Sequence, residues 1–212
     1  MADIFQEVDE DLRRDRFTKL WRKYGSFVIA AAVAVVIATG AYVAWKNYRA
    51  KQLMAEGDSF IQAVLLRNAG QSRQATEAFA ALAERARDGY GALARFSQAS
   101  VMAERGEAAE AVKIYDQLAT SAPDTALRDL ATICSVSLSL ESADPAELKA
   151  KLEPISAPDN PLRHSARELS ALLALHTGDT ATARELFKEL AADKSAPSGV
   201  RSRAEEMLQA LI

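Results

Sequence analysis

The sequence has 212 residues, a length that favours one domain with at most an appendage. Hydrophobic residues make up 49% and charged residues 26%, which excludes disorder of the whole chain. There are 43 Ala against nine Gly and six Pro, so we expect helices and not an all-β fold. A formal charge of -3 leaves no basic excess for nucleic acid, and one cysteine, Cys134, excludes an intramolecular disulfide or a Cys-rich zinc site.

Residues 25–45 form an uncharged run of 21 residues. As a helix this run would be about 31 Å long, close to the roughly 30 Å hydrocarbon thickness of a bilayer. Aromatic residues flank both ends, as membrane interfaces favour; they are Trp21, Tyr24, Tyr42, Trp45 and Tyr48. We therefore predict a transmembrane helix over 25–45, with a buried helix of a soluble core as the alternative.

Basic residues predict the orientation of this helix. Six Lys or Arg precede the run and three follow it closely, so the positive-inside rule keeps residues 1–24 in the cytoplasm. A cleaved signal peptide is the alternative, because Thr39-Gly40-Ala41 has the small residues of a cleavage site. The apolar run is longer than the usual ~7 to 15 residues of such a peptide, which favours an uncleaved anchor.

Within the run, Ala30, Ala34 and Ala38 recur every four residues and share one helical face. Small side chains at this spacing let a second helix approach closely, so these are the predicted packing residues of the membrane helix. Seven of the 21 residues are alanine, so an accidental small-residue face is the alternative.

The remaining residues, 46–212, contain a repeat. Its markers are Gly70, Gly106 and Gly178, separated by 36 and then 72 residues. Alanine follows each glycine after five residues, an aromatic after nine and leucine after twelve: Ala75, Ala111, Ala183; Phe79, Tyr115, Phe187; Leu82, Leu118, Leu190. This pattern predicts a helix, a tight turn at the glycine and a second helix that packs closely through its alanine.

A fourth copy is expected near residue 142, where Ala143 takes the glycine position. The three later positions then fall on Leu148, Leu152 and Ile155. The copy lacks the glycine, the alanine and the aromatic, so it is a drifted repeat.

Helix boundaries carry their own signals. Asp144-Pro145 predicts an N-cap followed by Pro at the first helical position, and Asn160-Pro161 predicts a similar start. The alternating residues 134–140 would also fit a strand, but helical spacing of the apolar residues around them favours a helix. Residues 198–212 carry one apolar stripe and are predicted to cap an all-α stack of about four helix pairs.

One repeat resembles the second half of the tetratricopeptide repeat through its glycine, alanine, aromatic and trailing proline. These residues are Gly106, Ala111, Tyr115 and Pro123. The first half departs from that motif, because the motif's early large residues fall on Arg95 and Gln98, with Ala99 in its small-residue position.

The charged tail, the single span and the YGALA stretch at 90–94 extend this likeness to the whole chain. The chain resembles the family of tetratricopeptide-like inner-membrane proteins that includes the ancillary subunit of the SecYEG translocon. The resemblance implies a type II protein of the bacterial inner membrane. It also implies a periplasmic helical domain that associates with the translocon and with periplasmic chaperones.

Partner-binding positions also follow from the resemblance, because the first helix of each tetratricopeptide pair lines the concave face. Transferred by spacing, the positions are Phe60, Val64, Arg67, Asn68, Phe96, Ser100, Glu104, Ile133, Ser137, Glu141, Leu172 and His176. The mixture is more apolar than a clamp for a peptide carboxylate needs, which favours loosely specific apolar contacts. The alternative is that the apolar members belong to the core of irregular repeats.

No motif indicates catalysis, a cofactor or a metal. HExxH, GxSxG and P-loop patterns are absent, and His164 and His176 are interpreted as ordinary helix residues. Residues 89–94 fit GxGxxA, but a helix is predicted before them where dinucleotide binding needs a strand. Cys134 lies at an apolar helix position, which favours a buried, inert thiol. We expect no enzyme, no cofactor, no metal and no small-molecule substrate.

The sequence therefore favours a membrane-anchored, non-catalytic scaffold for protein–protein interaction. The resemblance implies an ancillary translocon-associated subunit that links secreted chains to periplasmic chaperones. An assembly factor for one envelope, respiratory or cytochrome-maturation complex is the alternative.

Topology is the first testable consequence. We predict a cytoplasmic tail at 1–24, a transmembrane helix at 25–45 and a periplasmic tetratricopeptide-like domain at 46–212. Protease added to intact spheroplasts should remove the large domain. Survival of that domain until lysis would show the opposite orientation, and a mature N-terminus near Tyr42 would establish cleavage.

Overall fold

The computed structural model describes the backbone of residues 2–86 and 89–211, with the side chains of Thr18, 20–86 and 89–211. Every regular element in these ranges is an α-helix. The helices are α1 (Ala2–Asn68), α2 (Ser72–Arg85), α3 (Gly89–Glu104), α4 (Ala108–Ser121), α5 (Thr125–Ser139), α6 (Pro145–Leu152), α7 (Arg163–His176), α8 (Thr180–Ala192) and α9 (Ser198–Ala210). Internal contacts divide the chain into two units, Met1–Ala55 and Glu56–Ile212.

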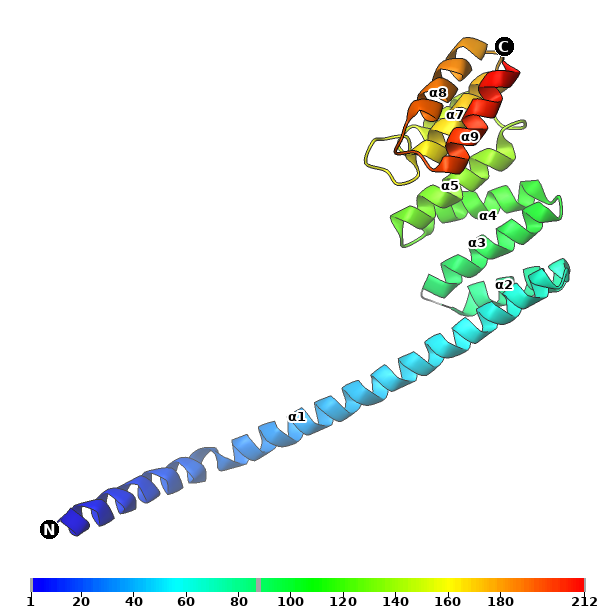
Figure 1. Cartoon of the computed structure of the whole chain (residues 1–212). Coiled ribbons are helices and arrows are strands. Elements are labelled where there is room, and N and C mark those ends of the chain that lie inside the picture. Colours follow the sequence, from blue (N-terminus) through cyan, green and yellow to red (C-terminus); the bar gives the residue numbers. More distant parts are fainter. Residues whose placement is uncertain (1, 87–88, 212) are drawn as a thin grey trace. The chain divides into compact units, whose positions relative to one another are not determined.

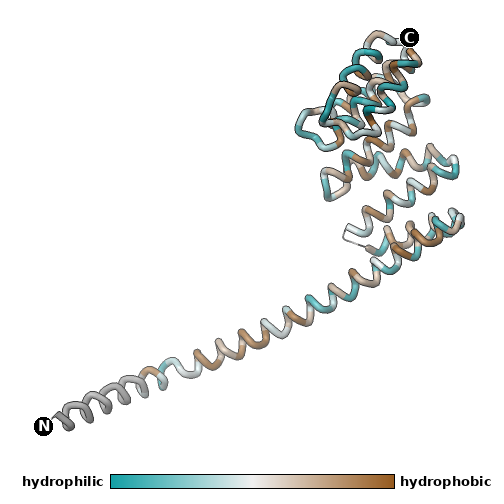
Figure 2. The backbone as a smooth tube through the Cα atoms, in the orientation of Figure 1, coloured by the Kyte–Doolittle hydropathy of each residue, from teal (hydrophilic) through white to brown (hydrophobic). Residues whose placement is uncertain are grey.

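The first unit is formed by the N-terminal part of α1, which contains the predicted span (Figure 2). The segment Leu20–Asn68 is one candidate membrane span by length and composition, because it contains a strongly apolar 18-residue window. None of that window is buried, in contrast to the core helix of a soluble protein. The orientation of this helix across the membrane stays a prediction, because length and composition identify a span but not its direction.

The second unit, Glu56–Ile212, begins with the end of α1 and continues through α9. From α2 to α9 each helix packs against the next, and α5 with α7 and α7 with α9 are in contact as well. Figure 1 shows α3, α4 and α5 as successive antiparallel layers. The end of α1 pairs with α2, and α3/α4, α5/α6 and α7/α8 follow, with α9 last. This arrangement confirms the predicted all-α stack of four helix pairs and a capping helix.

The three repeat glycines form the same turn. Gly70, Gly106 and Gly178 have φ of 74°, 84° and 82°, and no other described residue has a positive φ. At Gly70 the backbone N–H donates to Arg67 O at 2.9 Å and the next N–H donates to Leu66 O at 2.9 Å, and the other two turns repeat this pattern. Two such bonds satisfy the last carbonyls of the first helix while the chain reverses.

Behind each turn the predicted small and aromatic positions are buried. Ala75, Ala111 and Ala183 are all 0% exposed. The three aromatics and three leucines that follow are at most 3% exposed: Phe79, Tyr115, Phe187, Leu82, Leu118 and Leu190. The spacing therefore correctly identified the face by which each second helix packs.

The drifted repeat keeps this packing without the glycine turn. Leu148, Leu152 and Ile155 are 0%, 1% and 2% exposed and pack with Val136 of α5. Its second helix, α6, has 8 residues, against 14 in α2 and α4 and 13 in α8. The Ala143 N–H bonds to Ser139 O at 2.9 Å, a bond that needs no left-handed residue.

One predicted helix start was right and one was wrong. The Asp144 carboxylate caps α6 by accepting from Ala146 N–H, and Pro145 is the first helical residue. In contrast, α7 begins at Arg163 and not at Pro161. Asn160 makes the same kind of capping bond as Asp144, because its Oδ1 accepts from Leu162 N–H at 2.8 Å. The helix nevertheless starts later, because Arg163 N–H bonds to Asn160 O at 3.2 Å and closes a tighter turn over residues 160–163.

Enlarging the buried alanine of a regular repeat tests the packing. We expect Ala111→Leu or Ala183→Leu to lower the free energy of unfolding by about 1 to 3 kcal/mol, because the paired helices must move apart. Ala109 is exposed on the same helix α4, so Ala109→Leu is the matched control. Thermal unfolding in detergent measures the difference, and equal melting temperatures for Ala111→Leu and Ala109→Leu would contradict the packing assignment.

Candidate functional site

The predicted partner-binding residues come from α1, α3, α5 and α7, with one exception. Glu141 lies two residues beyond the end of α5, so its assignment to a first helix was wrong. Asn68 and His176 are the last residues of α1 and α7. Asn68, Glu104, Ser137, Glu141 and His176 are exposed, and the other seven predicted residues are half-buried.

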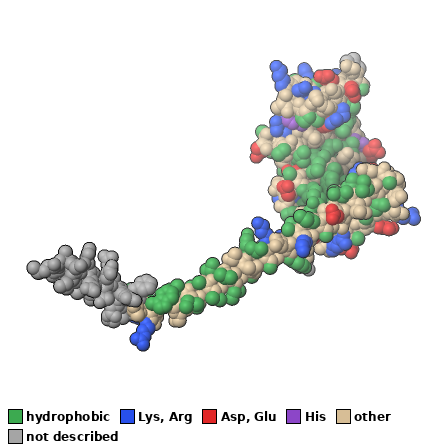
Figure 3. All heavy atoms as spheres, turned by 60° about the horizontal axis from the view of Figure 1, so that its bottom comes forward, with side chains coloured by type: hydrophobic (Ala, Val, Ile, Leu, Met, Phe, Trp, Pro, Cys, Tyr) green, Lys and Arg blue, Asp and Glu red, His purple; other side chains and the backbone are tan. Residues whose placement is uncertain are grey.

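The apolar residues among the predicted partner-binding positions are partly exposed and also contact the core. Phe60 packs against Phe79 and Tyr90, with ring centroids 5.4 and 6.1 Å apart. Phe96 meets Tyr115 edge to face at 5.1 Å. Val64, Ile133 and Leu172 also pack against buried clusters while remaining half-buried. Figure 3 shows many apolar side chains exposed together on one face of this unit, so these residues are neither fully core nor fully surface.

Two predicted polar residues pair with each other. The Arg67 guanidinium of α1 forms an ion pair with the Glu104 carboxylate of α3, and its Nε donates to Glu104 Oε2 at 3.3 Å. Their side chains are 39% and 48% exposed, so the pair contributes at most about 1 kcal/mol. Its effect is to join the first two repeats and to make this part of the surface nearly neutral.

A polar cluster that the sequence did not reveal lies beneath Phe96. The Tyr115 hydroxyl of α4 lies near Ser100 of α3 and Cys134 of α5, both of which influence its pKa. Burial is the main cause that raises the pKa of Tyr115 to about 12, and burial also raises the pKa of the Cys134 thiol. Cys134 is half-buried and not fully buried as predicted, yet its raised pKa keeps it a thiol.

A second unpredicted cluster joins His164, Asp193 and Ser195. His164 is 5% exposed, and its Nε2 lies 3.0 Å from Asp193 Oδ2. The Ser195 hydroxyl and N–H both donate to Asp193 Oδ1, at 2.6 and 2.8 Å, and with His164 they hold the pKa of Asp193 well below its usual range. The residues lie 29 and 31 positions apart, so no local motif could reveal the cluster.

This His, Asp and Ser set does not have the order of a catalytic triad. In a triad the imidazole stands between the acid and the nucleophile and uses one ring nitrogen for each. Here His164 Nε2 faces both partners, with Ser195 Oγ at 3.4 Å, and the serine donates its proton to the acid. The arrangement ties α7 to the connection between α8 and α9.

Two further predictions concern ligands and membrane packing. In the part of the chain that the structure describes, no group of three or more His, Cys, Asp or Glu is placed to hold a metal ion. Ala30, Ala34 and Ala38 lie exposed on α1, and their role in contacting a second helix stays a prediction.

The buried tyrosine gives a pH-dependent prediction. Its folded-state pKa of about 12 lies above the ordinary value of 10.0, so its contribution to stability is complete below pH 10 and is lost as the pH rises through 12. Between pH 8 and 11 we expect the wild-type chain to lose about 1 kcal/mol more than Tyr115→Phe. Melting temperatures of the full chain in detergent measure this, with Tyr90→Phe as control. Identical pH profiles for wild type and Tyr115→Phe would show that the phenol is not buried.

Comparison with known protein families gives one match over nearly the whole chain. Residues 18–211 match the family described as the tetratricopeptide repeat-like domain. No curated protein matches the chain, and no solved structure matches it. The family match spans the candidate membrane helix as well as the repeats, in agreement with the helix pairs and glycine turns. The chain belongs to the family of tetratricopeptide repeat-like domains.

Proposed function

We propose that this protein is a non-catalytic scaffold, anchored in the bacterial inner membrane, whose repeat domain holds protein partners in the periplasm. Membership of the tetratricopeptide repeat-like family indicates protein–protein interaction. The supporting observation is that Phe60, Phe96, Ile133 and Leu172 come from four successive first helices, and all are half-buried. Half-exposed apolar side chains from successive repeats offer an extended surface for apolar contacts with another polypeptide.

The proposed partners are the SecYEG translocon and periplasmic chaperones, with emerging secreted chains as clients. The candidate span supports this proposal, because a single anchor would hold the domain beside the membrane at which such chains emerge. Confinement by a short linker raises the effective concentration of a domain and its client toward the millimolar range. Weak contacts between the repeat domain and its client would then be sufficient for binding.

A division of labour between the two units is part of the proposal. The membrane helix would provide association with the translocon through Ala30, Ala34 and Ala38, which suit close helix packing. The repeat domain would provide contacts with chaperones or clients.

Crosslinking in intact membranes followed by affinity purification tests the function. We expect the wild-type chain to recover translocon subunits and secretory precursors. Ser137 is exposed on α5, so Ser137→Arg adds bulk and charge to the proposed surface without removing a core contact, and it should lower precursor recovery several-fold. Replacing 25–45 by an unrelated span of equal length should abolish translocon recovery and leave periplasmic partners bound.

Ala109→Arg, exposed on α4 outside the proposed surface, is the control for Ser137→Arg. Equal losses of precursor recovery with Ser137→Arg and Ala109→Arg would contradict the assignment of the partner-binding surface. Recovery of one stoichiometric partner would instead identify an assembly factor for a single complex. Wild-type translocon yield from both the swapped-span protein and residues 46–212 alone would make the helix an anchor only.

A further inference from the structure

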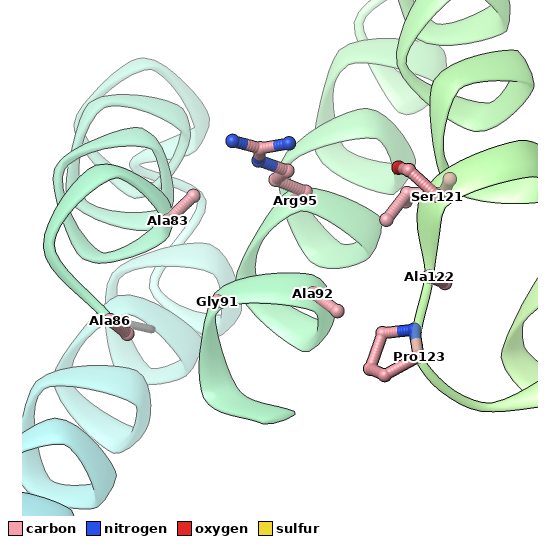
Figure 4. Close-up of a pocket in the computed structure, with 9 residues that line it drawn as sticks. Ala83, Ala86, Gly91, Ala92, Arg95, Ser121, Ala122 and Pro123 are labelled. Carbon is pink, nitrogen blue, oxygen red and sulfur yellow. The ribbon is translucent and has the colours of Figure 1, made fainter. Parts of the chain in front are cut away.

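A pocket of about 340 Å³ lies where the ends of α2 and α4 face the beginning of α3 (Figure 4). It is distinct from the surface of predicted partner-binding residues, none of which lines it. The lining consists mainly of small residues: Ala83, Ala86, Gly91, Ala92, Arg95, Leu118, Ser121, Ala122 and Pro123. None of these nine residues is acidic.

The shape of the pocket depends on a close approach at Gly91. A Cβ on this residue would lie 2.5 Å from the carbonyl oxygen of Ala86, so only glycine fits without moving the backbone. Ala86 and Ala122 end their helices in the same extended conformation, with ψ of 124° and 140°. The chain therefore leaves α2 and α4, which form two walls of the pocket, in the same extended conformation.

Arg95 supplies the charge of the pocket. Its side chain is exposed, and it forms no hydrogen bond or ion pair with any residue that the structure describes. Figure 4 shows the Arg95 guanidinium and the Ser121 hydroxyl on the same side of the pocket. The Ser121 hydroxyl donates to Gln117 O at 2.7 Å, so among the described lining side chains the guanidinium is the donor left for a ligand.

The repeat itself offers a comparison for Arg95. Arg95 precedes Gly106 by 11 residues, and Arg167 precedes Gly178 by the same 11 residues. Arg167 is half-buried, and its guanidinium donates to the carbonyl of Ser156 at 3.3 Å. The fold thus uses one of these two equivalent arginines internally and leaves the other facing an open pocket.

We propose that this pocket binds an acidic side chain of a partner polypeptide, whose carboxylate pairs with Arg95 while its aliphatic stem lies against Ala92 and Pro123. Charge complementarity carries the assignment, because a guanidinium without a described partner stands in a pocket whose nine described lining residues include no acid. The planar guanidinium donates two parallel hydrogen bonds to a carboxylate. The small lining residues leave room for a side chain with two or three carbons. This inference rests on the proposed function, since the ligand is part of a protein partner.

Titration of the full chain in detergent with two peptides tests the pocket, with the backbone N–H and Arg Nε–H resonances followed by NMR. The probes are acetyl-Ala-Glu-Ala-amide and acetyl-Ala-Gln-Ala-amide. We expect the Glu peptide to shift the resonances of Gly91, Ala92 and Arg95 in a saturable manner. The Gln peptide should bind about tenfold more weakly or worse, because it cannot form the charge-assisted pair.

Matched variants locate the effect. Arg95→Gln should abolish binding of the Glu peptide, whereas Arg167→Gln and Arg73→Gln, the latter at an exposed position of α2, should retain it. Equal binding of the two peptides, absence of binding, or equal loss in all three variants would each overturn the proposal. Sodium acetate binding as tightly as the Glu peptide would also overturn it, because the pocket would then be a simple anion site.

The outcome is separable from that of the proposed function. Peptide binding at Arg95 with no partner in the crosslinking experiment would contradict the proposed scaffold function and support the proposed binding pocket. Partner recovery that falls in Ser137→Arg, with no peptide binding at Arg95, would contradict only the proposed binding pocket.

Discussion

The stack depends on how closely the two helices of each repeat approach at one alanine. Ala75, Ala111 and Ala183 have no exposed surface, and a larger side chain at any of them would push the paired helices apart. The glycine turn places this alanine five residues later at a fixed position, because the turn's two backbone bonds set the path of the chain. The drifted repeat accepts Leu148 instead, in a shorter helix that follows a different turn.

Much of this architecture could be predicted, because the information is local. The spacing from each glycine to its alanine, aromatic and leucine determines one helix face, and that face is buried in every regular repeat. The Asp144 cap was predictable for the same reason, since cap and helix are adjacent in sequence. The start of α7 was predicted two residues too early, because residues 160–163 close a tighter turn before the α-helix begins.

The proposed partner-binding surface shows the same limit. The transferred spacing places the predicted residues other than Glu141 on first helices, but it cannot give their depth. Phe60 and Phe96 are half-buried because Phe79 and Tyr115 of the second helices lie against them. The cluster of His164, Asp193 and Ser195 joins α7 to the connection between α8 and α9, and the pocket beside Arg95 combines residues of α2, α3 and α4. No single segment encodes either of them.

The short helix α6 has a consequence for how local unfolding spreads along the domain. In a stack of repeats, a local opening spreads only through the interfaces between neighbours, and the weakest interface divides the cooperative units. With 8 residues, α6 is the shortest helix of the stack, but Val136 of α5 and Ala166 and Leu169 of α7 share one buried cluster. This direct contact between α5 and α7 bypasses α6. A local opening of α6 would therefore leave α5 and α7 in contact with each other.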